Sequence, residues 1–197
     1  MPSYKLYYFA GRGRAELPRL MFKEAGVPFV DERITDWPNH KAEMPFGQMP
    51  VLEIDGFKLS QTGAIVNYLA RELKLIDTKC NLSHAKVEEL LGAAGDCMQN
   101  LPYFEKDAEK KAATVKEIME GKVIPTFEKL EGKVAGSTTY LKEFSFADLA
   151  VLAFVDSLND FDSSVIGRFP KLKKVYDSTA ARPKVAAYLA TRPKTPF

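Results

Sequence analysis

The sequence predicts an α/β domain at the amino end, followed by an all-helical domain. Within the first 75 residues, short aromatic or β-branched runs alternate with helical stretches. The remainder carries almost no run with the period of two that marks a strand. The change in pattern predicts a domain boundary, with the α/β domain at residues 1–76 and the helical domain at residues 77–197.

Composition limits the class of protein. Apolar residues make up 46% and charged residues 27% of the 197 residues, which are ordinary values for a folded globular chain. The net charge of +2 is too small to be the electrostatic footprint of a nucleic-acid-binding protein. No apolar run approaches the roughly 20 residues of a membrane span, and the opening residues lack the apolar core of a secretory signal. We therefore expect a cytoplasmic protein with no membrane span.

The order of elements in the first domain indicates its topology. Asp55-Gly56 between two short apolar runs is a hairpin signal, so the sheet ends in an antiparallel pair. Pro50 stands directly before a strand, where an X–Pro bond is readily held in the cis form. The expected strands are Tyr4–Phe9, Phe29–Ile34, Val51–Ile54 and Phe57–Leu59, and the expected helices are Ala15–Ala25, Trp37–Glu43 and Gln61–Leu73. This βαβαββα order is that of a thioredoxin-like domain.

The second half begins with an amphipathic helix. Val87, Leu90, Leu91, Ala94, Met98 and Leu101 repeat at helical spacing and form one apolar stripe. Asp96 lies roughly half a turn away from that stripe, because a helix has 3.6 residues per turn. Gly92 and Gly95 flank it, which indicates either close approach of another subunit or simple tolerance of glycine.

A second helix start is well specified. Ser145-Phe146-Ala147-Asp148 has the spacing of a capping box. The apolar residues that follow cover a wide face, which predicts a nearly buried helix. Two shorter helices are expected at about residues 170–179 and 183–191.

The two cysteines do not indicate redox or metal chemistry. Cys80 and Cys97 show neither a CxxC motif nor metal-ligand spacing, so we predict neither a disulfide framework nor a metal site. Cys97 is interpreted as a small core residue. A thioredoxin-like disulfide reductase would need a reactive cysteine near the first helix, and neither cysteine lies there.

Several motifs in a fixed order resemble sigma-class glutathione transferases, especially the nematode members. They are Tyr8-Phe9, Arg12-Gly13-Arg14-Ala15-Glu16, Trp37, Pro45-Phe46-Gly47-Gln48-Met49-Pro50-Val51-Leu52, Gln61-Thr62, Tyr68-Leu69-Ala70-Arg71-Glu72, the capping box, and Arg192-Pro193 with terminal Phe197. The resemblance extends over both predicted domains. Related branches include haematopoietic prostaglandin D synthases and cephalopod lens crystallins.

The resemblance implies that Tyr8 activates the thiol of glutathione. A thiol has a pKa near 8.5, and only its thiolate attacks electrophiles. A tyrosine hydroxyl can stabilise the thiolate by donating a hydrogen bond. Tyr7 points to the opposite face of its strand from Tyr8, and Tyr4 is farther from the strand's carboxyl end. Arg14 resembles the arginine that supports the sulfur environment, with Arg12 as a rival.

The same resemblance implies a binding site for glutathione as co-substrate. Met49, before the suspected cis-Pro50, would pair its backbone with the cysteinyl unit, and Gln61 with Thr62 would receive the γ-glutamyl carboxylate. Asp96 would reach across a homodimer interface to the γ-glutamyl ammonium bound by the other subunit. The full expected set is Tyr8, Trp37, Lys41, Gln48, Met49, Pro50, Gln61, Thr62 and the partner subunit's Asp96.

For the apolar electrophile, the resemblance implies a wall between the two domains formed by Phe9, Gly13, Met98, Tyr103 and Phe197. The expected activity is conjugation of glutathione to small apolar electrophiles. Hydroperoxide reduction and isomerisation of prostaglandin H2 to D2 stay open, although Tyr103 replaces the tryptophan of the prostaglandin synthase branch. The alternative is a non-catalytic ligand-binding or crystallin-like structural protein on the same fold.

Overall fold

The computed structural model of the chain describes residues 2–195. By their contacts, these residues fall into two compact units. The first unit contains the described residues up to Leu75 together with those from Arg182 onward, and the second contains Ile76–Ala181. The last helix therefore packs with the α/β unit, although the sequence pattern alone groups it with the helical residues that precede it.

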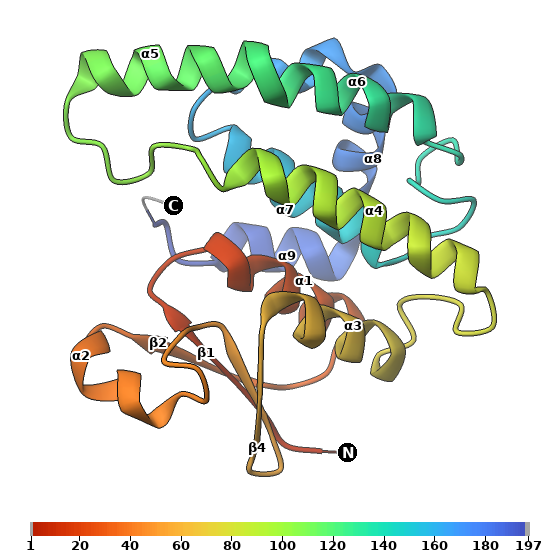
Figure 1. The fold of residues 1–197 in the computed structure, drawn as a ribbon. Helices are drawn as coiled ribbons and strands as arrows, with labels where there is room; N and C mark the ends of the chain where they lie inside the picture. The colour runs from red at the N-terminus through yellow and green to blue at the C-terminus, as the bar shows by residue number, and fades with distance from the viewer. Residues whose placement is uncertain (1, 196–197) are drawn as a thin grey trace. The chain divides into compact units, whose positions relative to one another are not determined.

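The first unit is built on a four-stranded mixed sheet (Figure 1). The strand order is β2-β1-β3-β4, in which β1 pairs parallel with β2 and antiparallel with β3, and β4 pairs antiparallel with β3. The strands are β1 (Tyr4–Phe9), β2 (Val30–Ile34), β3 (Val51–Ile54) and β4 (Phe57–Ser60). The βαβαββα order predicted from the sequence is confirmed.

Helices complete this unit. Helix α1 packs against α3 and α9, and α3 contacts β3 and β4. Leu6 and Leu52, which pair across β1 and β3, are fully buried. Gly26, which precedes Val27 and Pro28, ends α1 in the left-handed conformation that favours glycine. The helices of this unit are η1 (Gly13–Ala15), α1 (Glu16–Ala25), α2 (Trp37–His40), η2 (Lys41–Glu43), α3 (Thr62–Glu72) and α9 (Pro183–Thr191).

The second unit is helical, and α7 is its central element. Ten of the 13 residues of α7 are buried, and the helix packs against α4 and α8. Between α5 and α6 the chain stays helical through the π-turn η3, so these segments run on as one long helix in Figure 1. The helices are α4 (Asn81–Met98), α5 (Ala108–Ile118), η3 (Met119–Val123), α6 (Ile124–Lys133), α7 (Phe146–Leu158), η4 (Val165–Arg168) and α8 (Pro170–Ala180).

The capping box at the start of α7 is confirmed. The Ser145 hydroxyl accepts a hydrogen bond from the backbone N–H of Ala147, and the Asp148 carboxylate accepts the N–H of Ser145 at 2.7 Å. The other carboxylate oxygen accepts the N–H of Tyr140, also at 2.7 Å, so Asp148 ties the preceding loop to the helix. Among residues 2–195, we find no helix with the length and apolar character that a membrane crossing requires.

Candidate active site

Strand pairing brings four loop segments of the first unit to one edge of its sheet. β1 ends at Phe9, and the parallel strand β2 ends opposite it at Ile34. β3 runs the other way and begins at Val51, opposite Tyr7, while β4 ends opposite Val51 at Ser60. The residues that follow β1, β2 and β4 therefore lie at the same edge as the residues that precede β3.

This edge carries most of the side chains that the sequence nominates. Tyr8 and Phe9 end β1, and the other predicted residues of this unit are Gly13 and Arg14 in the next turn, Trp37 in α2, Lys41 in η2, Gln48, Met49 and Pro50 before β3, and Gln61 and Thr62 at the start of α3. Their convergence follows from topology. Their individual roles stay predictions.

Tyr8 is held by the turn between β1 and α1. Burial alternates along β1, with Tyr4, Leu6 and Tyr8 on the buried face. The backbone N–H of Arg14 donates a hydrogen bond to the Tyr8 phenolic oxygen at 3.1 Å. Gly13 has φ of +38°, and a Cβ on it would lie 2.6 Å from that oxygen, so the turn approaches the hydroxyl more closely than a side chain allows. The oxygen accepts through a lone pair and keeps its own O–H for donation.

Tyr7, on the opposite face of β1, has a different partner. Its hydroxyl donates to the Glu53 carboxylate at 2.8 Å. Burial, and then the hydrogen bond to Glu53, raise the pKa of Tyr7 to about 12. The Tyr4 hydroxyl lies 3.5 Å from that of Tyr68, and burial raises the pKa of Tyr4 as well. Of these three tyrosines, it is Tyr8 whose hydroxyl meets the turn at the edge of the sheet.

Aromatic rings continue from Tyr8 along the edge. The Phe9 ring lies edge-on to Tyr8, with centroids 5.4 Å apart, and edge-on to Trp37, with centroids 5.6 Å apart. Such tilted pairs are the favoured arrangement of aromatic rings. Lys41, one turn beyond Trp37, is exposed. The edge thus offers an apolar wall beside a cationic side chain.

The segments around β3 and β4 have unusual backbones. The Met49–Pro50 bond is cis, which confirms the prediction for Pro50. Gln61 caps α3 with φ of 73°, a conformation that costs a residue other than glycine about 1–3 kcal/mol. The 11-residue helix α3 starts at Thr62, and the first N–H groups of a helix have no partner within it and attract anions.

The remaining predicted residues lie in the second unit. Asp96 is exposed on α4, and neighbouring space is open at Gly92 and Gly95, where an added Cβ meets nothing within 4 Å. The hydroxyl of Tyr103 lies 3.8 Å from the Met98 sulfur, and the Tyr103 ring packs edge-on to Phe161. Phe197 lies outside the described residues.

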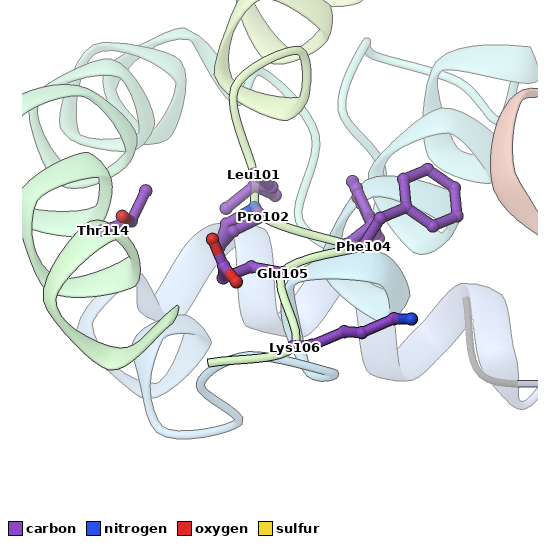
Figure 2. Close-up of a pocket in the computed structure, with 7 residues that line it drawn as sticks. Leu101, Pro102, Phe104, Glu105, Lys106 and Thr114 are labelled. Carbon is purple, nitrogen blue, oxygen red and sulfur yellow. The ribbon is translucent and has the colours of Figure 1, made fainter. Parts of the chain in front are cut away.

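A depression of about 640 Å³ opens beside Tyr103. It is lined by Leu101, Pro102, Tyr103, Phe104, Glu105, Lys106 and Thr114, most of which Figure 2 labels. Phe104 is 80% exposed, which is unusual for a large apolar side chain. In the sequence, the only signal that Phe104 lines this depression is its place next to Tyr103, after a helix.

Sequence reasoning also misses Arg19, whose side chain is fully buried. Its guanidinium carbon lies 5.9 Å from the centre of the Tyr8 ring. The one available signal is that Glu16 and Arg19 place two charges, one turn apart, among the apolar residues of α1. Such a pair is most often solvated, so the sequence alone does not single it out.

Comparisons with known proteins cover the whole chain. Residues 3–71 match the family model "Glutathione S-transferase, N-terminal domain", and residues 97–192 match "Glutathione S-transferase, C-terminal domain". Glutathione S-transferase 1 of Ascaris suum is 36% identical, with all of both chains covered. S-crystallin SL11 of Nototodarus sloanii is 35% identical, again over all of both chains.

A solved structure, rat hPGDS complexed with a quinoline, matches all of both chains with a TM-score of 0.90 and 29% identity. The chain therefore has the fold of this solved structure, which is also the fold expected from the sequence motifs. Two domain models in the expected order and full-length relatives above 30% identity establish the relationship. The chain belongs to the glutathione S-transferase family.

Proposed function

We propose that this protein is a glutathione transferase that conjugates the thiolate of reduced glutathione to small apolar electrophiles. The observation that carries the proposal is the Tyr8 hydroxyl, which accepts the Arg14 N–H at the edge of the sheet where the loop segments of this unit converge. The family assignment and the relative named as a glutathione S-transferase support the same activity.

The chemistry needs a donor that stabilises sulfur as an anion. Tyr8 would donate its O–H to the thiolate of bound glutathione and lower the pKa of that thiol toward neutral pH. The Arg14 N–H, by donating to the same oxygen, polarises the O–H and strengthens it as a donor. The thiolate then attacks the electrophile, forming a carbon–sulfur bond as the leaving group departs. The exposed Arg14 side chain is proposed as a helper only.

The other groups at the edge suit the rest of the tripeptide. The start of α3, with Gln61 and Thr62, offers N–H and hydroxyl donors to the γ-glutamyl carboxylate. Trp37 and Lys41 would meet the glycine end, where the ammonium of Lys41 supplies charge. Gln48, Met49 and Pro50 would hold the cysteinyl backbone in extended form. For the electrophile we propose Phe9, Gly13, Met98 and Tyr103.

We further propose that the protein acts as a homodimer in the cytoplasm, with the partner subunit's Asp96 completing each glutathione site. On α4, Asp96 is exposed next to Gly92 and Gly95, which leave room for another backbone. Phe46, 69% exposed in the loop before β3, is an apolar side chain available to a partner. Light scattering tests the assembly, and a fully active monomer would contradict the shared site.

A second candidate is a non-catalytic protein that keeps the fold and binds ligands or serves a structural role. The 35% identity to an S-crystallin over the full chain favours considering it. The two candidates differ in what they require of Tyr8, since a structural protein has no need for an activated thiolate.

Steady-state conjugation of glutathione to an aryl halide tests the proposed function. Reduction of an organic hydroperoxide and isomerisation of prostaglandin H2 are assayed in parallel. We expect conjugation of the aryl halide that is first order in enzyme and saturable in glutathione. Inactivity in all three assays, with glutathione binding intact by calorimetry, would favour the non-catalytic candidate.

A further inference from the structure

Arg19 holds the turn that follows β1. From the middle of α1 its Nη1 atom donates hydrogen bonds to the carbonyl oxygens of Gly11, at 2.6 Å, and Arg12, at 3.3 Å. The side chain is fully buried, so these bonds are not exchanged for bonds to water. Both bonds come from Nη1, and the rigid fork of the guanidinium fixes the directions of its N–H groups, which suits it to hold two successive carbonyls in one orientation.

Two carboxylates compensate the charge of Arg19, Glu16 on the buried side and the partly exposed Asp31 on the other. Its Nε donates to Asp31 at 2.9 Å, and Nη1 lies 3.6 Å from Glu16. Glu16 is itself buried, and it accepts a hydrogen bond from Arg192 at 2.7 Å. The other oxygen of Asp31 accepts one from Arg33 at 2.9 Å. These five side chains, here called the Arg19 network, alternate in charge from Arg33 to Arg192.

The last helix of the unit takes part in the network. The Tyr188 hydroxyl of α9 donates to Glu16 at 3.1 Å, and burial followed by the nearby charge of Glu16 raises the pKa of Tyr188. The tyrosine therefore stays protonated and keeps donating. Glu16 is thus oriented by two donors from the carboxyl-terminal segment, and it contacts Arg19 from that fixed position.

The turn held by Arg19 is the one that contacts Tyr8. It carries Gly13, whose backbone lies against the Tyr8 hydroxyl, and Arg14, whose N–H donates to the phenolic oxygen at 3.1 Å. The Arg19 guanidinium also lies 5.9 Å from the Tyr8 ring centre. Arg19 therefore lies near the Tyr8 ring and bonds to the two residues that precede the backbone at the hydroxyl.

We propose that Arg19 is a positioning residue for Tyr8, and that it keeps the Arg14 N–H on the phenolic oxygen by fixing the carbonyls of Gly11 and Arg12. The proposal rests on the proposed function, in which Tyr8 donates to the thiolate of glutathione. A buried ion pair adds little stability compared with apolar residues of the same size, so stability alone does not explain five connected charges. Of the five side chains, Arg19 is the one that bonds to the turn.

The test compares the variant Arg19→Lys with the control Arg33→Met. Lysine keeps the charge but not the fork, so Arg19→Lys is the variant expected to fold with the turn loosened. Arg33 binds the same Asp31 carboxylate and forms no hydrogen bond or ion pair with the described residues of the turn, so its loss should leave the hydroxyl in place. We expect Arg19→Lys to lower kcat about tenfold with less than a threefold change in KM for glutathione. The pKa of bound glutathione, followed by thiolate absorbance, should rise by about one unit, which corresponds to that tenfold loss.

A double-mutant cycle separates positioning from general destabilisation. If Arg19 acts through the Tyr8 hydroxyl, Arg19→Lys added to Tyr8→Phe should lower kcat by less than twofold further. The same tenfold loss in both backgrounds, or an unchanged thiol pKa in Arg19→Lys, would overturn the proposal.

Amide hydrogen exchange of Arg14 gives a readout that needs no activity. It should quicken about tenfold in Arg19→Lys and stay unchanged in Arg33→Met. A wild-type protein that neither binds nor conjugates glutathione would refute the proposed function, whereas an active wild type with a normal Arg19→Lys variant would refute the role of Arg19 alone.

Discussion

The backbone N–H of Arg14 donates a hydrogen bond to the phenolic oxygen of Tyr8 at 3.1 Å, across a turn in which Gly13 leaves no room for a side chain. The phenolic oxygen thus meets a backbone donor, while its O–H stays available to an acceptor outside the turn. The neighbouring tyrosine of the same strand, Tyr7, donates to Glu53 instead. Chemically equal side chains are therefore set apart by their partners.

Tyr8→Phe should keep the fold and bind glutathione nearly normally, but lose most of the conjugation rate. A hydrogen bond to a charged group contributes about 1.5–3 kcal/mol, so the pKa of bound glutathione should rise by roughly one to two units. At neutral pH kcat should fall roughly 10- to 150-fold, and the loss should shrink as the pH rises and hydroxide deprotonates the thiol. Thiolate absorbance against pH measures the change directly. Tyr7→Phe is the matched control, and an equal loss in both variants would remove the special role of Tyr8.

Gln61→Ala should raise KM for glutathione more than it lowers kcat. The proposed contact with the γ-glutamyl carboxylate is made equally before and during the chemical step, and losing such a contact weakens binding without slowing chemistry. At this positive φ, alanine and glutamine have about the same unfavourable backbone energy. The change in KM therefore reports the loss of the side-chain amide. Steady-state kinetics with varied glutathione give both constants. Gln99→Ala, at an exposed glutamine of the other unit, should change neither constant, and a fall in kcat at constant KM for Gln61→Ala would contradict its assignment.

Asp148→Asn should destabilise the helical unit by about 2–5 kcal/mol. Asparagine has one side-chain oxygen in place of the two carboxylate oxygens, so one of the two buried N–H groups loses its acceptor. The side chain is fully buried and accepts the N–H groups of Tyr140 and Ser145. Asp107→Asn is the control: Asp107 caps exposed α5, and asparagine caps helices about as well as aspartate. Chemical denaturation followed by circular dichroism compares the two. Equal stability of both variants would show that the Asp148 contacts add nothing beyond an ordinary cap.

Cys80 should react with iodoacetamide well before Cys97. The Ser83 hydroxyl donates to the Cys80 sulfur at 3.1 Å, and this bond with the nearby backbone lowers the pKa of Cys80. Burial raises the pKa of Cys97. The ratio of Cys80 thiolate to Cys97 thiolate is largest below the pKa of Cys80 and falls as the pH rises past it, so the preference should shrink toward alkaline pH. Mass spectrometry after brief labelling measures both sites. Ser83→Ala should slow labelling of Cys80 and leave Cys97 unchanged, and faster labelling of Cys97 in the native protein would reverse the assignment.

The order of elements was predictable because local chemistry determines it. The Asp55-Gly56 hairpin, the glycine stop after α1 and the capping box at Ser145 each act within a few residues, and the structure has all three. The cis bond at Pro50 belongs with them, since the signal was the proline before a strand. The π-turn at residues 119–123 was not predicted, because such a turn leaves no periodic signal of its own.

The sequence by itself determined the order of strands and helices in the first unit and the antiparallel pair at the end of its sheet, because period-two runs and short turns act within a few residues. Only the tertiary structure showed that the Arg14 N–H meets the Tyr8 hydroxyl and that the buried Arg19 bonds to the same turn. Arg19, Glu16 and Arg192 are up to 176 residues apart, so their contacts depend on α9 packing against α1. No local pattern distinguishes such side chains from solvated charges, because the energy of a buried charge depends on partners that only the folded chain supplies.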